Sequence, residues 1–255
     1  MKKDEIIKIK NSLWELCEPW ESITQETIES LGKEDALHII DYHGQNWIGI
    51  VNEWIPAKYS EGEQNCIIDM QFLALFKEII WLHFLFQTAN YSLVHRNLRY
   101  ILEMMAQAHY VDLKYPGLVP DEQFEKAIEI EDTKISAWDL VKNALCNILN
   151  CNESRLDRKY KETWNHLNKH VHPSAKRMKM DDEIDPSRYF IDSYNETLAK
   201  ETLEIVDKVF DVIYLIIFNR FPCISDLLLQ DKFIDIWKIH SPDTIKYTKE
   251  VASQF

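Results

Sequence analysis

The chain has 255 residues, of which 46% are hydrophobic and 12% aromatic. This composition supplies a buried core and excludes a disordered or low-complexity chain. Only five Gly and eight Pro are present, too few for the many tight turns of an all-β sandwich, so helices are favoured. A net charge of −13 excludes a generally basic coat for nucleic acid or a binder of anionic membranes, while a local basic site stays compatible with it.

The cysteines and the apolar stretches bear on the compartment. Five cysteines are scattered along the chain without a Cys-x-x-Cys pair, which indicates a reducing environment and offers no zinc ribbon. No apolar stretch approaches the roughly 20 residues that a membrane span needs. The N-terminus leads into an amphipathic pattern and lacks the apolar region of a secretory signal. We therefore expect a cytoplasmic protein that does not cross a membrane.

Apolar periodicity predicts helices through the first half of the chain. Residues 4–17 place their apolar side chains near one helical face. Residues 41–54 show no clear periodicity, and residues 47–51 within them fit either a short strand or a helical turn. Residues 66–88 are apolar nearly all round, which predicts a helix buried centrally among its neighbours. A second long helix is expected to begin at Ser92, as its cap, and to end near Lys114, before a Pro-Gly turn.

Further amphipathic segments predict helices in the second half, at 121–131, 136–149, 154–171, 188–219 and 224–239. A loop is expected at 174–187, where there is little to bury. The fold class is all-α, a helical bundle whose core spans residues 65–221. Residues 1–64 are expected to form an N-terminal helical cap, and residues 222–255 a C-terminal helix that packs on the core, all within one compact unit.

The helix predicted from residue 92 has two chemically different sides. Its apolar side carries Leu98, Ile101, Leu102, Met105 and Ala108. Its other side is mixed and carries His95, Arg96, Arg99, Glu103, Gln107 and Tyr110. If this side is solvated, the i,i+4 pair of Arg99 and Glu103 is a surface ion pair worth about 0.3–0.5 kcal/mol. If the helix is central, the same pair is a held and oriented donor, as a phosphate-binding site requires.

A second segment, residues 154–179, carries a charge of +6 within the acidic chain, with eight Lys and Arg against two acidic residues. Its apolar face holds Leu156, Tyr160, Trp164, Leu167 and Val171. One flank carries Arg158, Lys161, Asn165, Asn168 and His172. The opposite flank carries His166 and His170 at i,i+4, the spacing of two metal ligands, but no third ligand and no His-Glu-x-x-His glutamate accompany them.

His172 should mark the end of this helix, because Pro173 disfavours helical conformation at the residue before it. At a helix C-terminus the macrodipole favours the protonated imidazole. Two roles fit this position. One is a terminating cation that interacts with the last carbonyls, and the other is an acid–base group acting on a phosphodiester amid Lys and Arg.

Three stretches together resemble the HEPN-like helical proteins of prokaryotes, in particular members related to abortive infection. They are LRYILEMMAQAHY, which contains Arg99 and Glu103, then Tyr160-x6-Leu167-x3-Val171-His172-Pro173-Ser174, and the apolar TLEIVDKVFDVIYLIIFNRF. The resemblance covers about residues 70–221. It implies a helical bundle, often dimeric, and in active members a metal-independent ribonuclease with an Arg-x(4–6)-His motif. No Arg precedes His172 at that spacing here, so the positive charge would have to come from Arg96 or Arg99.

Three functions are compatible with these observations. The first is a non-enzymatic or weakly active helical protein that acts through RNA or protein partners, as a homo-oligomer or as one half of a toxin–antitoxin or defence pair. The second is a ribonuclease that needs no metal or cofactor, with His172 as general acid or base, Arg96 and Arg99 stabilising the phosphate, and Glu103 orienting Arg99. Its substrate would be bound by Asn168, Asn165, Lys161, Arg158 and Tyr110. The third is a helical metal-binding protein that uses His166 and His170.

Overall fold

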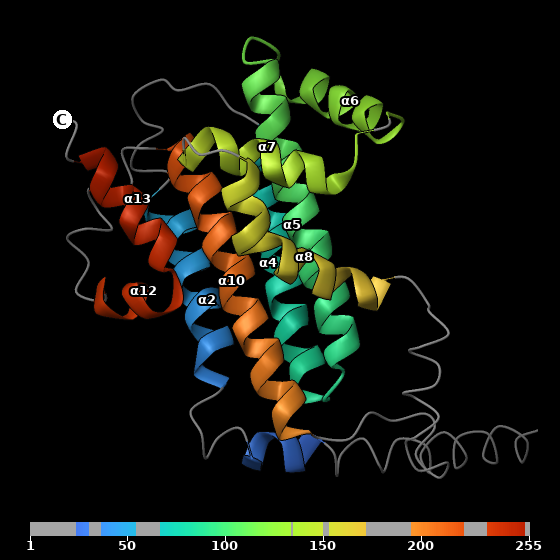
Figure 1. The fold of residues 1–255 in the computed structure, drawn as a ribbon, viewed down its shortest axis with the longest axis vertical. Coiled ribbons are helices and arrows are strands. Elements are labelled where there is room, and N and C mark those ends of the chain that lie inside the picture. Colours follow the sequence, from blue (N-terminus) through green and yellow to red (C-terminus); the bar gives the residue numbers. More distant parts are fainter. Residues whose placement is uncertain are drawn as a thin grey trace, which may run out of the picture.

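A computed structural model describes residues 24–30, 37–54, 67–133, 135–149, 153–171, 195–221 and 234–252. Every regular element among them is a helix, which confirms the all-α prediction (Figure 1). The elements are α2 (Leu37–Gly49), η1 (Ile50–Trp54, a π-helical turn), α4 (Ile67–Gln87), α5 (Tyr91–Lys114), α6 (Pro120–Glu131), α7 (Ala137–Leu149), α8 (Glu153–Val171), α10 (Glu196–Arg220), α12 (Ile234–His240) and α13 (Pro242–Ala252). The helix expected over 4–17 and the loop expected over 174–187 lie outside the described residues. The division into cap, core and C-terminal segment stays a prediction.

Residues 41–54 are helical, which decides between the strand and the helical turn that their sequence left open. Trp47 and Ile50 of this segment are fully buried. α2 packs against α4 and α10. The burial of these two side chains against neighbouring helices fixes the helical form of a segment whose two glycines weaken it locally.

α5 lies at the centre of the bundle and contacts α4, α7, α8 and α10 (Figure 1). The predicted cap was wrong by two residues: the Asn90 side chain, and not that of Ser92, accepts a hydrogen bond from the Leu93 N–H at 3.2 Å. Asn90 also closes the end of α4, because its N–H donates to the Leu85 carbonyl at 2.9 Å, while Ala89 adopts a left-handed φ of 55°. This Schellman-type turn reverses the chain and sets α4 and α5 side by side, antiparallel.

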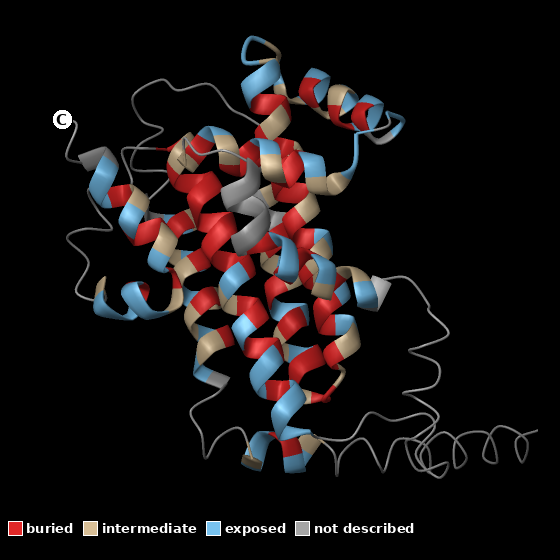
Figure 2. Cartoon of the chain, in the orientation of Figure 1, coloured by how far each residue is buried: buried red, intermediate tan, exposed pale blue. Residues whose placement is uncertain are grey.

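α10 is the most completely buried helix of the described chain, and Figure 2 shows its upper half almost wholly buried. Every residue from Val209 to Phe218 is buried, because α2, α5, α7 and α13 all pack against this helix. The continuous apolar sequence of α10 therefore corresponds to a helix that is buried on all sides.

Central burial was also predicted for α4, and there the prediction was wrong. Ile79, Leu82 and Phe86 are buried on its inner face. Ile80 and Trp81, however, expose 56% and 49% of their surface. Among the described helices, α2, α5 and α6 make the main contacts with α4, and none of these three covers the side that carries Ile80 and Trp81.

The C-terminal helices α12 and α13 pack on α10, whereas the sequence predicted one C-terminal helix within residues 222–255. Asp211 of α10 anchors the start of α13: its carboxylate accepts hydrogen bonds from the Asp243 N–H at 3.0 Å and the Thr244 N–H at 2.9 Å. The Thr244 hydroxyl donates to the same carboxylate at 2.7 Å. Asp211 thus satisfies amides at the helix N-terminus that have no partner within the helix. None of the described helices is both long enough and apolar enough to cross a bilayer.

Candidate functional site

The predicted ion pair of α5 forms and is largely shielded from solvent. The Nε atom of Arg99 donates to Oε1 of Glu103 at 2.6 Å, and the two side chains expose 16% and 32% of their surface. The guanidinium carbon lies 5.1 Å from the centroid of the Trp164 ring on α8, within the range of a cation–π contact. Arg99 is therefore held between a carboxylate on its own helix and an aromatic ring on the next, with a fixed orientation.

The two segments singled out in the sequence pack against each other. Tyr160, Trp164 and Leu167 are buried, as expected for the apolar face of α8. His95 of α5 is also buried, although it was assigned to the polar side, and its ring centroid lies 4.8 Å from that of His166 on α8. Contact between α5 and α8 thus covers part of the mixed stripe of α5.

The other predicted site residues are distributed more widely. Arg96, Lys161 and Asn165 are exposed, and Asn168 is half-buried. Tyr110 accepts a hydrogen bond from the Lys114 ammonium at 3.0 Å. It lies 11 residues after Arg99, roughly 16 Å along α5 at 1.5 Å per residue, which separates it from the Arg99 pair.

Two predictions concern positions that the structure does not describe. His172 lies outside the described residues, and so do the side chains of Arg158 and His170. Within the described part of the chain, no three His, Cys, Asp or Glu side chains gather as a ligand set for a metal ion. The His172 site and the His166–His170 metal site both stay predictions.

An exposed apolar surface, which we call the aromatic face, runs over α4 and α5. Five large side chains form it, with exposed fractions from 36% to 56%: Ile80, Trp81, Phe84, Leu93 and Tyr100. The rings of Trp81 and Phe84 are stacked, with centroids 5.0 Å apart. Trp81, Leu93 and Tyr100 border a shallow depression together with Lys77, Glu78 and Arg96.

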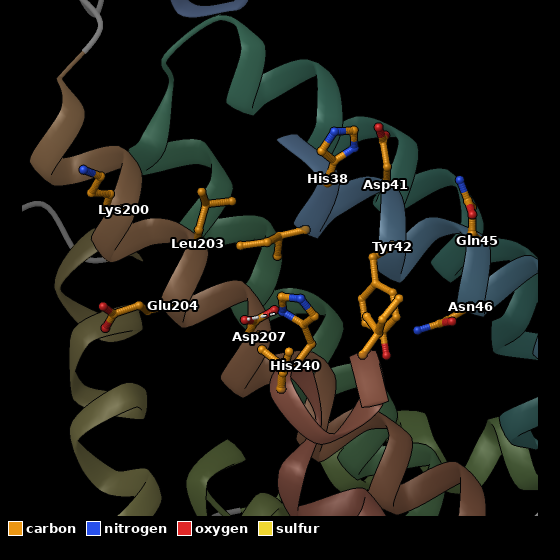
Figure 3. A pocket seen from close by; sticks show the side chains of 13 residues that line it. His38, Asp41, Tyr42, Gln45, Asn46, Lys200, Leu203, Glu204, Asp207 and His240 are labelled. Carbon is orange, nitrogen blue, oxygen red and sulfur yellow. Dashed lines mark hydrogen bonds and ion pairs between the residues drawn. The ribbon is translucent and has the colours of Figure 1, made fainter. Parts of the chain in front are cut away.

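A pocket of about 950 Å³ between α2, α10 and α12 is the second feature that the sequence did not indicate (Figure 3). At its wall the carboxylate of Asp207 bridges two imidazoles, with His43 Nε2 at 2.8 Å from Oδ1 and His240 Nδ1 at 2.9 Å from Oδ2. His43 continues inward, because its Nδ1 lies 3.0 Å from the Tyr214 hydroxyl. A hydrogen-bonded chain therefore runs from the core to the pocket.

The pKa shifts of His43 and Asp207 agree with an ionised carboxylate beside a neutral His43. Burial lowers the pKa of His43 and outweighs the opposing influence of Asp207. Burial alone would raise the pKa of Asp207, but the hydrogen bonds from His240 and His43 hold it below its ordinary value. Asp207 is thus an ionised acceptor between two imidazole donors, and His43 is neutral.

Comparisons of the chain with protein-family models, curated proteins and solved structures found no match. The resemblance to HEPN-like proteins stays a prediction, carried by the three stretches that show it. The aromatic face, the Arg99–Glu103 pair and the pocket are the features from which a function can be inferred.

Proposed function

We propose that this protein is a non-enzymatic helical interaction module that forms a homodimer through the aromatic face of α4 and α5. The observation that carries the proposal is the clustering of five exposed large apolar side chains on two adjacent antiparallel helices. Contiguous apolar patches on soluble proteins mark interaction sites. Trp, Tyr and Phe are also enriched among the residues that contribute most to binding energy in protein interfaces.

The charges around the aromatic face favour a second copy of the chain over RNA. Lys77 and Arg96 border the face, but the carboxylate residue Glu78 lines the same depression. Binding RNA requires several phosphates to be neutralised together, which two cations beside a carboxylate do poorly. In a two-fold dimer each copy can place a cation opposite the partner's carboxylate, because the same patch meets itself in reversed orientation. In a toxin–antitoxin or defence pair, such a dimer would be the unit that meets the other component.

The oligomeric state tests the proposal. We expect light scattering after size exclusion to give a dimer mass for the wild type at about 100 µM, above the dissociation constants of weak dimers. Trp81→Glu should give a monomer with an unchanged helical circular dichroism spectrum, because the side chain is half-exposed. Ile128→Glu is the matched control: Ile128 exposes 54% of its surface on α6, away from the aromatic face, and the variant should stay dimeric.

Two results would contradict this proposal. A monomeric wild type would remove the homodimer. A dimer that Trp81→Glu leaves intact would place the interface elsewhere. A monomer that instead binds single-stranded RNA, and loses that binding in Trp81→Glu, would assign the aromatic face to RNA.

The Arg99 geometry favours metal-independent RNA cleavage as a second candidate function. Glu103 and Trp164 hold the guanidinium against α8, and the chain beyond the end of α8 at Val171 continues directly into His172. A guanidinium held in a fixed orientation is suited to stabilising a phosphodiester transition state. We expect cleavage of single-stranded RNA in the presence of a metal chelator, abolished by His172→Ala and unaffected by His38→Ala, an exposed histidine on α2. Failure of the wild type to cleave would refute this candidate.

A further inference from the structure

We propose that the pocket between α2, α10 and α12 binds a small organic cation, an ammonium group on an apolar or aromatic body, with Nε2 of His240 as its hydrogen-bond acceptor. This site is separate from the aromatic face and from the Arg99 pair. The proposal depends on three properties of the pocket: the orientation of one imidazole, the charge of the wall, and its apolar and aromatic surface.

The orientation of His240 leaves one nitrogen available to a ligand. A carboxylate can only accept hydrogen bonds, so both imidazoles that contact Asp207 must donate to it. His240 therefore carries a proton on Nδ1, which lies 2.9 Å from Asp207. In the neutral ring Nε2 then holds a lone pair. Within the described chain no hydrogen bond to this Nε2 is found, and His240 lines the pocket (Figure 3).

The charge of the wall favours a cation. Asp41, Glu204 and Asp207 line the pocket, against Lys200 as the one ammonium group among its described lining residues. The Lys200 ammonium lies 2.6 Å from a carboxylate oxygen of Glu196, and a carboxylate oxygen of Glu204 lies 4.0 Å from the Lys208 ammonium, so these two partners outside the lining offset each other. The excess of carboxylates gives the cavity a negative potential, which attracts cationic ligands and repels anionic ones.

The remaining wall is apolar and aromatic, as a ligand with a hydrocarbon body requires. Ile39, Leu203, Ile236 and Ile239 line it, and Ile239 exposes 71% of its surface. The Tyr42 ring lies beside His240, with centroids 4.9 Å apart, and offers a π face to a cation. A volume of about 950 Å³ lies in the range of pockets that enclose small molecules.

The test uses the full chain and three probes of matched shape: benzylammonium, benzyl alcohol and benzoate. By isothermal titration calorimetry we expect benzylammonium to bind with a Kd on the order of 1 mM, as a fragment of this size does, and the other two at least about tenfold more weakly. The ¹⁵N signal of His240 Nε2 should shift with benzylammonium. Glu204→Gln should weaken binding roughly threefold, and His240→Phe at least about tenfold. Glu129→Gln removes an exposed carboxylate on α6 and should change nothing.

Each alternative result is decisive. Equal binding of benzyl alcohol would show a merely apolar pocket, and preferred binding of benzoate would reverse the charge assignment. No binding of benzylammonium at about 10 mM, well above the expected Kd, would remove the site. If His240→Phe fails to fold, the affinity of Glu204→Gln and the ¹⁵N signal of the wild type still test whether the pocket binds the cation. Trp81→Glu should leave the affinity unchanged, which separates this proposal from the dimer.

Discussion

His109 of α5 is a buried histidine that costs the protein stability. Only 1% of its surface is exposed, and neither ring nitrogen has a hydrogen-bond partner in the described structure. Burial, with a smaller contribution from the charge of Arg220, lowers its pKa to about 4. An unsatisfied buried polar group costs about 1–3 kcal/mol. His109→Leu, which is similar in size and has no polar atom, should therefore stabilise the protein by about 1 kcal/mol at neutral pH.

The same substitution should remove a pH dependence. Below the ordinary imidazole value of 6.5 the unfolded chain binds a proton at His109, while the folded protein does not bind one until its own pKa of about 4. Stability therefore falls as the pH falls through this window. At 1.36 kcal/mol per pKa unit, the loss from this one group is about 3 kcal/mol over the whole window and about 2 kcal/mol by pH 5.

Urea unfolding at about pH 7.5 and about pH 5 measures both effects. We expect the stability of the wild type to fall by about 2 kcal/mol more than that of His109→Leu on acidification. Thr202→Val is the matched control, because the Thr202 hydroxyl is also buried without a hydrogen-bond partner in the described chain but cannot titrate. It should stabilise the protein equally at both pH values. If His109→Leu loses as much stability as the wild type, the folded protein protonates His109 and the reasoning fails.

Two further substitutions test single contacts. Asp211→Ala removes the acceptor of two amides and a hydroxyl at the start of α13. Urea unfolding should therefore show that the free energy of unfolding falls by about 2–3 kcal/mol. A fall below about 1 kcal/mol would mean that water replaces the carboxylate. Glu103→Gln leaves Arg99 without its charged partner. Because Glu103 is about a third exposed, thermal unfolding should show a loss of no more than about 1 kcal/mol that shrinks with added salt, and a loss that is independent of salt would contradict an electrostatic origin.

The apolar periodicity of the sequence correctly predicted which side of a helix is buried. The apolar side of α5 is buried as expected, including Leu98 and Met105, because a 3.6-residue repeat places these side chains on one side whatever the neighbours are. The same repeat says nothing of how many neighbours a helix has. α4 and α10 both have strongly apolar sequences, yet only α10 is covered along a run of consecutive residues. The aromatic face was missed for this reason.

In the candidate sites, too, contacts within one helix could be predicted from the sequence, whereas contacts between helices could not. The Arg99–Glu103 pair could be predicted, because i,i+4 partners meet on any helix. The contact of Arg99 with Trp164 could not be predicted, because it depends on how α8 packs against α5. The pocket joins His43, Asp207 and His240, which come from three helices far apart in the sequence. No spacing connects them, and each one alone reads as an ordinary polar residue of an amphipathic helix.

Asp207 and Asp211 lie one turn apart on α10, and both hold C-terminal helices, but their pKa values move in opposite directions. Hydrogen bonds from two imidazoles outweigh burial at Asp207 and lower its pKa, so its contribution to stability is lost as the pH falls. Burial dominates at Asp211 and raises its pKa to about 6, against the opposing hydrogen bonds from Thr244. The folded protein therefore binds a proton at Asp211 between pH 3.8 and about 6 that the unfolded chain has lost, and stability from this group falls as the pH rises. The two groups act in successive pH ranges, because Asp211 titrates between pH 3.8 and about 6 and Asp207 only below 3.8. Acidification should therefore first strengthen the attachment of α13 through Asp211 and then weaken that of α12 through Asp207.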